Sequence, residues 1–245
     1  MSMKKSLRMI CALLTLLNPK HWGPFVEAAE TSGFDHGFTI SWSQGGEDLA
    51  LLTYLRDVKN GSYVDVGAHH PDRFSVTRHL YQSGWSGINI EANPALLKAF
   101  ENRRKRDVNL NFAVGLKDEY QLAVFTEPAI STVNLEWREK FQHEKQSITS
   151  VLTVSGIKLI EILNRYFPTT QLDLLTVDAE GSDFEVLQSL HLETLTLSRK
   201  PKWIMVETTG LLKDVQDQEH VKLLLHNGYE IVSVLPMSTI LCLKK

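Results

Sequence analysis

The last two apolar runs of the chain can pair in only one way. The runs "EIVSV" and "TILCL" are separated by "LPMS", which is too short for the crossover that parallel neighbours need, so the two strands must be antiparallel. Upstream, short β-branched runs alternate with helical patterns, which predicts right-handed crossovers and mainly parallel strands. The continuous apolar runs "LDLLTV" and "WIMV" are typical of parallel strands that are buried on both faces.

Eight apolar runs have the length and composition of strands, and most segments between them carry helical patterns. Strands are predicted at residues 62–67, 87–91, 108–114, 121–126, 172–178, 202–208, 229–234 and 239–243. Helices are predicted near residues 73–83, 94–106, 156–167, 183–190 and 215–227, and another begins at Glu47 and Asp48, whose charges suit a helix N-terminus. The sequence therefore predicts one α/β domain with a mainly parallel seven-stranded sheet, a C-terminal antiparallel hairpin, and helices on both faces.

The composition limits the kinds of binding partner and the cellular compartment that are expected for this chain. With 26 basic and 29 acidic side chains, the chain offers no general electrostatic case for nucleic acid or an anionic membrane, and a small-molecule or glycan partner is expected. The basic run "NRRKRD" lies at the end of a predicted helix and is interpreted as a solvated face rather than a nucleic-acid patch. Cys11 and Cys242 show no pairing or metal spacing, which favours the reducing cytoplasm.

The N-terminal segment is predicted to be a separate arm. Basic residues precede an apolar patch at residues 9–17, but this patch is too short to span a bilayer, and no small-residue cleavage site follows it. An amphipathic docking helix is favoured over an export signal, and contact with a membrane surface stays open. An arm or lid is therefore assigned to residues 1–42 and the main domain to residues 43–245.

The turn after the first predicted strand carries the most chemistry. In an open parallel sheet, ligands bind beyond the carboxyl ends of the strands. A dinucleotide fold has G-x-G-x-x-G at this place, whereas this chain has "GAHHPD", in which Pro71 removes an N–H and Asp72 adds negative charge where a phosphate would lie. S-adenosylmethionine carries no phosphate and has an ammonium group and a positive sulfur, so the carboxylate of Asp65 suits it; a turn-capping Asp65 is the alternative.

The second predicted strand ends in another acidic residue. Glu91 lies 26 positions after Asp65, at the tip of the neighbouring parallel strand, where a carboxylate can accept hydrogen bonds from ribose hydroxyls. This feature fits NAD equally well. The glycine-poor first turn therefore discriminates between the two cofactors and favours S-adenosylmethionine.

The ordered motifs of the chain resemble those of a known family. The set "SQGGEDL", "YVDVGA", "GINIEANP", "LNFAVG", "LDLLTVDAEGSDFEVLQSL" and "WIMVET" is similar to the FkbM family of S-adenosylmethionine-dependent methyltransferases. The resemblance implies a class I methyltransferase fold and methyl transfer, typically to a hydroxyl of a sugar or a secondary metabolite. By position, Asp65, Gly67 and Ala68 would surround the methionine part of the cofactor, Glu91 the ribose, and Asn111, Phe112 and Ala113 the adenine.

Two features depart from the family pattern. Thr176 stands where members often carry lysine, and His69, His70 and Pro71 replace an Asn-x-Gly. We expect His69 to border the cofactor, whereas turn packing around Pro71 is the alternative for both histidines. Gln44, in the "SQGGED" motif, is a further candidate contact to cofactor or acceptor.

The segment "VDAEGSDFE" supplies the candidate catalytic groups. A hydroxyl acceptor must lose its proton, so a general base is expected. Asp178 and Glu180 would point to the same side of an extended strand end and face the cleft, whereas Asp183 and Glu185 are interpreted as helix-start residues. With Glu207, these carboxylates could hold a divalent cation, but no metal site is predicted.

The sequence gives fewer indications of the residues that bind the methyl acceptor. Residues 127–146 are polar and aromatic, which is typical of an acceptor loop or lid, and Trp42 and Trp137 are candidates for stacking on a sugar. Two alternatives to an O-methyltransferase stay open: a nicotinamide-dependent oxidoreductase, and a cofactor-binding module without catalysis.

Overall fold

The computed structural model describes residues 39–244. The predicted arm over residues 1–42 lies outside the described residues except for its last four positions. Within the described part, the strands are β1 (Ser62–Val66), β2 (Ser86–Ile90), β3 (Val108–Leu110), β4 (Ala113–Val114), β5 (Glu119–Phe125), β6 (Ile148–Ile157), β7 (Leu174–Val177), β8 (Trp203–Glu207), β9 (Tyr229–Val234) and β10 (Ser238–Leu243). The α-helices are α3 (Glu47–Leu55), α4 (Arg78–Gln82), α5 (Pro94–Arg103), α6 (Leu135–His143), α7 (Leu159–Tyr166), α8 (Asp183–Gln188), α9 (Leu212–Val215) and α10 (Glu219–His226).

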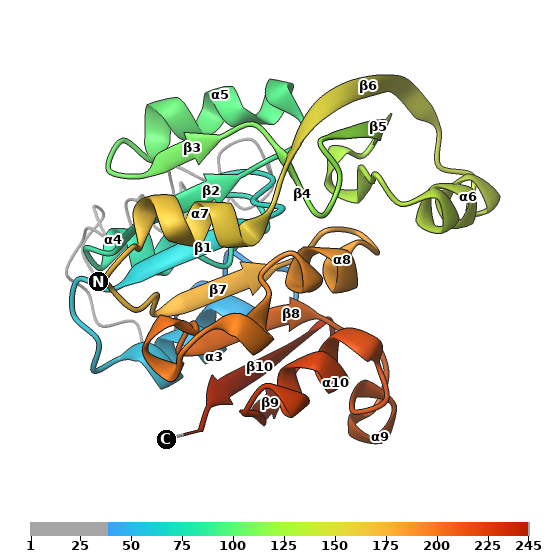
Figure 1. Ribbon diagram of the computed structural model, residues 1–245. Helices are drawn as coiled ribbons and strands as arrows, with labels where there is room; N and C mark the ends of the chain where they lie inside the picture. Colours follow the sequence, from blue (N-terminus) through green and yellow to red (C-terminus); the bar gives the residue numbers. More distant parts are fainter. Residues whose placement is uncertain (1–38, 245) are drawn as a thin grey trace, which may run out of the picture. The chain divides into compact units, whose positions relative to one another are not determined.

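Seven of these strands form the main sheet, in the order β3-β2-β1-β7-β8-β10-β9. The first five are parallel to one another, whereas β10 is antiparallel to both β8 and β9. Figure 1 shows this sheet running through the domain, with α7, α8 and α10 on the near side. The prediction of a mainly parallel seven-stranded sheet with a C-terminal antiparallel hairpin is confirmed.

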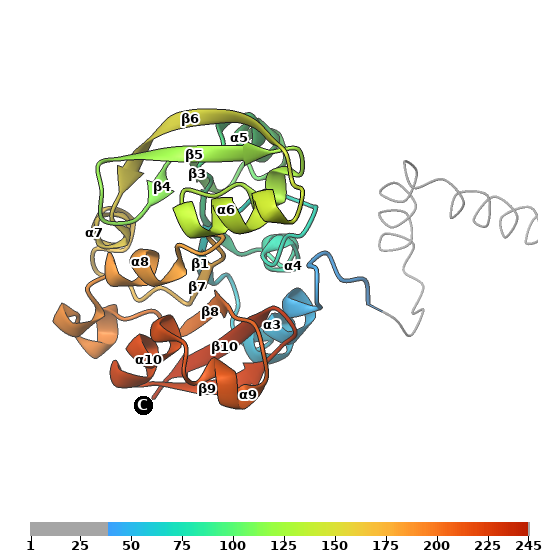
Figure 2. The ribbon, with the colours of Figure 1, turned by 90° about the vertical axis from the view of Figure 1, so that its right-hand side faces the viewer.

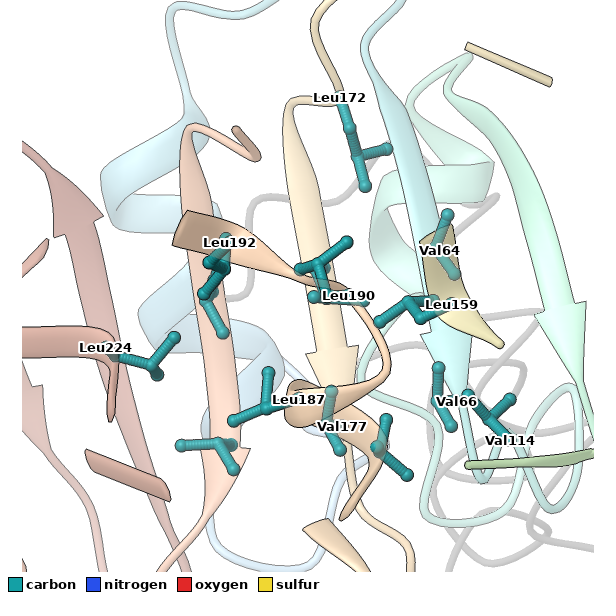
Figure 3. Close-up of a cluster of buried hydrophobic side chains, with 14 of the residues drawn as sticks. Val64, Val66, Val114, Leu159, Leu172, Val177, Leu187, Leu190, Leu192 and Leu224 are labelled. Carbon is teal, nitrogen blue, oxygen red and sulfur yellow. The ribbon is translucent and has the colours of Figure 1, made fainter. Parts of the chain in front are cut away.

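Both faces of the main sheet are buried. Side chains of β1, β7 and β8 that point to one face pack against α7, α8 and α10, as Val64, Leu159 and Leu187 illustrate (Figure 3). On the opposite face, Tyr63 and Met205 pack with Leu51 of α3 and Leu80 of α4. Alternate residues of β1 therefore bury on opposite faces, which places Asp65 on the side of α3 and α4.

A second, smaller sheet interrupts the α/β alternation. It has the order β4-β6-β5 and lies at the top of Figure 2 with α6, next to the β3 edge of the main sheet. The predicted strand at residues 121–126 belongs to this sheet rather than to the main one. The predicted strand at residues 108–114 is divided between the two sheets, because β3 pairs with β2 whereas β4 pairs with β6.

Several predicted boundaries are wrong. The helix predicted at residues 73–83 is limited to α4, and the one predicted at residues 215–227 is divided into α9 and α10. The ten-residue β6 was not predicted and takes the first positions assigned to the helix at residues 156–167. Residues 127–146, predicted as a loop, contain α6 and a short 3-10 helix at Pro128–Ile130.

Candidate active site

The carboxyl ends of β1, β2 and β7 border the main cleft, which has a volume of about 580 Å³. Its lining includes Gly67, His69, Glu91, Phe112, Ala113, Asp178 and Glu180. A second cavity, of about 460 Å³, shares Gly67 and Asp178 with it and is also lined by Gln44, Glu47, Asp65, Ala68 and Thr176. The structure thus brings all the predicted site residues except Asn111 to the linings of two adjoining cavities.

Gly67 lies at the junction of the two cavities. Its φ is +77°, and a Cβ at this position would lie 1.8 Å from the backbone oxygen of Asp178. Both conditions exclude a side chain, because a left-handed backbone disfavours other residues and backbone cannot yield as a flexible side chain can. The turn after β1 can therefore pass close to the end of β7, which keeps the two strand ends at one site.

Asp65 is held by two hydroxyl groups. Its Oδ2 accepts from Thr77 Oγ1 and its Oδ1 from Thr176 Oγ1, both at 2.8 Å. Burial raises the pKa of this carboxyl group, and the two hydrogen bonds oppose that shift. Thr176, which replaces a lysine common in the family, thus positions Asp65 across the β1–β7 pair.

Glu91 is fixed by two backbone amides. Its Oε2 accepts from His69 N at 2.8 Å and its Oε1 from Asn93 N at 2.7 Å. Burial raises the pKa of Glu91 to about 7. Each carboxylate oxygen still has acceptor capacity for a ligand hydroxyl, so the predicted ribose contact fits the geometry.

Asn111 lies beside the cleft without lining it. Its side-chain amide donates to the backbone oxygens of Glu91 and Ala92, at 2.7 and 2.9 Å. It therefore positions the turn after β2, whereas Phe112 and Ala113 line the cleft itself.

The two histidines have different surroundings. His70 Nδ1 accepts from the backbone N–H groups of Asp72 and Arg73, which is the expected turn packing around Pro71. His69 lines the main cleft, stacks on Phe74 with ring centroids 6.0 Å apart, and lies 3.1 Å from Arg73 Nη1. Burial lowers the pKa of His69 to about 4, so its imidazole is neutral near pH 7.

Asp72 does not present a free negative charge to the cleft. Its carboxylate forms ion pairs with Arg78 at 2.8 Å and Arg103 at 2.5 Å. The charge argument that the sequence suggested against a phosphate at this turn is therefore wrong, although Pro71 still lacks a donor.

Carboxyl groups gather beyond β7 and β8. Burial is the main cause that raises the pKa of Asp178 to about 7, of Glu180 to about 8 and of Glu207 to about 10. Repulsion from neighbouring carboxylates, that of Asp183 in all three cases, raises each pKa further. Glu180 does not continue the strand: its φ is +47°, and Ser182 N donates to Ala179 O in a tight turn. The alternation argument for Glu180 is therefore wrong, although Asp178 and Glu180 both line the cleft.

Asp183 and Glu185 have the structural contacts expected of helix-start residues. Asp183 Oδ1 accepts from Ala179 N at 3.0 Å, which closes the turn before α8. Glu185 Oε1 accepts from Tyr120 Oη at 2.5 Å and from Leu116 N at 3.1 Å, which links α8 to the smaller sheet. Among residues 39–244, no group of three or more His, Cys, Asp and Glu side chains is arranged to hold a metal ion.

A third cavity, of about 490 Å³, borders the same turn, residues 179–183, as the main cleft. It is lined by Trp137, Gly181, Asp183, Phe184, Glu207, Thr208, Thr209, Gln218 and His220. Burial lowers the pKa of His220, whose Nε2 is buried without a hydrogen-bond partner. The lining thus combines aromatic rings with acceptor and hydroxyl groups.

Glu47 was not predicted to be part of the site, and residues 127–146 were predicted to border the acceptor as a loop or lid but not to contain the helix α6. Glu47 was interpreted only as a first-turn residue, yet it is buried and lines the second cavity. Its position in "SQGGEDL", one of the family motifs, was the available signal. Arg73, which forms two 2.8 Å hydrogen bonds to Glu127, also connects the turn after β1 to the smaller sheet.

The sequence was compared with models of protein families. The model described as the methyltransferase FkbM domain matches residues 65–231, more than half of the 245 residues. The chain belongs to the FkbM methyltransferase family. This membership excludes the nicotinamide-dependent alternative and makes S-adenosylmethionine the cofactor of this FkbM protein.

The FkbM domain also aligns with solved structures of other methyltransferases. A TehB-like methyltransferase from Corynebacterium glutamicum is 11% identical, with 93% of this chain and 100% of that chain covered and a TM-score of 0.41. Precorrin-6y C5,15-methyltransferase from Geobacter metallireducens is 13% identical, with 86% of this chain and 95% of that chain covered and a TM-score of 0.46. Fibrillarin from Aeropyrum pernix, crystallised with S-adenosyl-L-methionine, is 10% identical, with 80% of this chain and 74% of that chain covered and a TM-score of 0.40. No curated protein matches the FkbM sequence.

The residues of the FkbM site fit this cofactor. Glu91 presents a fixed carboxylate next to apolar Phe112 and Ala113, which suits a ribose beside an aromatic base. In the second cavity, Asp65 and Asp178 place negative charge where the positive methionine part would lie. In residues 39–244, no helix has both the length and the apolar character that crossing a bilayer requires.

Proposed function

We propose that this methyltransferase transfers the methyl group to a hydroxyl of a sugar or related small metabolite in the cytoplasm. The observation that carries the proposal is the third cavity, with Trp137 and Phe184 on its walls beside Glu207, Thr208 and Gln218. Aromatic faces together with oxygen acceptors suit a polyhydroxylated acceptor, because its C–H faces stack and its hydroxyls donate. A nucleic-acid acceptor lacks support from net charge.

Asp178 and Glu180 would act between the two ligands. When bound, S-adenosylmethionine supplies an electrophilic methyl group on a positively charged sulfur. Asp178 and Glu180 line the cofactor cleft, and Gly181 and Asp183 of the same turn line the third cavity. Carboxyl groups with pKa values of about 7 and about 8 can accept a proton from an acceptor hydroxyl near neutral pH, since a base works best when its pKa is close to the working pH.

A methyl-transfer assay tests the proposal. The protein would be incubated with deuteromethyl-labelled S-adenosylmethionine and a panel of sugars, glycans and hydroxylated metabolites, and labelled products identified by mass. We expect a hydroxyl to carry the label and Glu180→Gln to slow a single turnover by about 10²- to 10⁴-fold, the usual range for a lost general base. Asp178→Asn should reduce turnover more than stability.

Three outcomes would contradict parts of this proposal. Label on nitrogen or carbon would refute O-methylation. Binding of S-adenosylhomocysteine without transfer to any acceptor would instead support a cofactor-binding module without catalysis. An unchanged single-turnover rate for Glu180→Gln would remove Glu180 from the mechanism.

A further inference from the structure

Glu47 is a buried carboxylate with one unpartnered oxygen. Only 3% of the residue is exposed. Its Oε2 accepts from Gly45 N at 2.8 Å, whereas its Oε1 is buried and has no hydrogen-bond partner. A buried carboxylate oxygen without a partner is costly to the fold, so this group points to a partner outside the chain.

The surroundings of Glu47 indicate the charge of that partner. The second cavity is lined by three carboxylates, Glu47, Asp65 and Asp178, and by no Lys, Arg or His among the described residues. Asp65 differs from Glu47 because both of its oxygens already accept hydrogen bonds from hydroxyl groups. Glu47 therefore presents a buried, unpartnered acceptor in an acidic cavity, and a ligand that carries a positive donor group would complement it.

We propose that Glu47 binds the ammonium group in the methionine part of S-adenosylmethionine. The proposal rests on the cofactor assignment. Glu47 would raise the affinity for ligands that contain the amino-acid part and would leave the affinity for ligands without it unchanged. An ammonium group offers three N–H donors and a full positive charge, which meets both the unpartnered oxygen of Glu47 and the acidic lining. Gln44, which lines the same cavity, has an amide that can donate to the neighbouring carboxylate of the ligand.

Gly45 keeps the Glu47 carboxylate in place. A Cβ at Gly45 would lie 2.5 Å from Glu47 Oε1 and 3.4 Å from its Cδ. Gly45→Ala would therefore displace the carboxylate while its charge is kept. This substitution separates the position of the group from its charge.

The test is calorimetric titration with two ligands that differ in the amino-acid part. S-adenosylhomocysteine contains the ammonium group, whereas 5′-methylthioadenosine lacks the whole amino-acid part. For Glu47→Gln we expect the dissociation constant of S-adenosylhomocysteine to rise about 10- to 100-fold, the range for a lost hydrogen bond to a charged group. The affinity for methylthioadenosine should stay within about twofold, because independent contacts contribute separately.

The controls use variants of the same chain. Glu161→Gln, a first-turn glutamate of α7 that is exposed, should leave both affinities unchanged. Gly45→Ala should weaken S-adenosylhomocysteine selectively, as Glu47→Gln does. The melting temperature of ligand-free Glu47→Gln should not fall, because the substitution removes an unpartnered buried charge.

The possible results separate this proposal from the cofactor assignment. Equal weakening of both ligands, unchanged affinity for both, or a lowered melting temperature in Glu47→Gln would refute the ammonium contact and leave the cofactor assignment standing. Failure of the unsubstituted protein to bind S-adenosylhomocysteine would refute both.

Discussion

At the scale of single residues, Glu91 is expected to bind a different part of the cofactor from the part that Glu47 binds. Its carboxylate faces the main cleft and is fixed by His69 N and Asn93 N. We predict that Glu91→Gln weakens both S-adenosylhomocysteine and methylthioadenosine by about 10- to 100-fold, because the ribose is common to both and a charged acceptor is lost. Titration with both ligands measures this effect. Glu101→Gln, an exposed residue of α5, serves as the control, and a selective loss of only one ligand would contradict the ribose assignment.

Residues at strand ends could be predicted from the sequence, whereas burial could not. Asp65, Gly67 and Glu91 follow directly from the rule that ligands bind at the carboxyl ends of parallel strands. Glu47 could not be assigned in this way, because its burial depends on how α3 packs against the main sheet. The same limit applies to Asn111, whose amide is taken up by two backbone oxygens that only the folded turn brings within reach.

At the scale of elements, Arg104 joins the end of α5 to the loop before α4. It is 2% exposed, so the solvated interpretation of "NRRKRD" is wrong for this residue. Its guanidinium donates to Pro71 O at 2.7 Å, Ser75 Oγ at 2.9 Å and Tyr63 Oη at 3.1 Å. Hydrogen bonds in these three directions need a planar group with several donors. The bonds to Pro71 and Ser75 hold the loop before α4 in a non-helical conformation.

Replacing Arg104 should therefore destabilise the protein strongly. We predict that Arg104→Met lowers the free energy of unfolding by about 3–5 kcal/mol, because a buried cation is lost and its acceptors remain. Urea denaturation measures the change. Lys105→Met, at an exposed neighbour in the same run, should change it by less than about 0.5 kcal/mol, and similar effects of the two substitutions would refute this role of Arg104.

The main-sheet elements were predictable because their patterns are strong, and the smaller sheet was not. The strands β1, β7 and β8 are mostly apolar and have no exposed positions. In β6, by contrast, exposed and half-buried positions follow no regular alternation. It is stabilised by its pairing with β5 over most of its length, and such long-range pairing leaves little signal in a local pattern.

At the scale of the whole molecule, the carboxyl groups beyond β7 and β8 make stability depend on pH. Their pKa values in the folded protein are raised to about 7 for Asp178 and about 8 for Glu180, mainly by burial, whereas those of unfolded carboxyl groups are about 4. Between these limits the folded state binds more protons than the unfolded state. The free energy of unfolding therefore falls as the pH rises from about 5 to about 8.

Glu207 provides the variant that tests this pH dependence. Its pKa is raised to about 10, first by burial and then by the neighbouring carboxylates. We predict that Glu207→Gln melts at a higher temperature than the unsubstituted protein at pH 8, and that this difference shrinks towards pH 5. Scanning calorimetry at the two pH values measures both effects. Exposed Glu230 supplies the control substitution, and a constant difference at all pH values would contradict the prediction.

The segment that forms the smaller sheet leaves and re-enters the main domain at neighbouring points, because Ala113 and Val114 of β4 pair with Gly156 and Ile157 of β6. A segment whose ends are adjacent can be lengthened, shortened or exchanged in evolution without disturbing its host, as other insertions are. This segment carries Trp137 to the third cavity, whereas Asp65, Glu47 and Asp178 belong to the main domain. Relatives could thus diversify their acceptors by changing the part of residues 115–155 that reaches the third cavity. The residues of the same segment that line the cofactor cleft would have to be kept; they are Leu122, Pro128, Ala129, Ser131 and Val133.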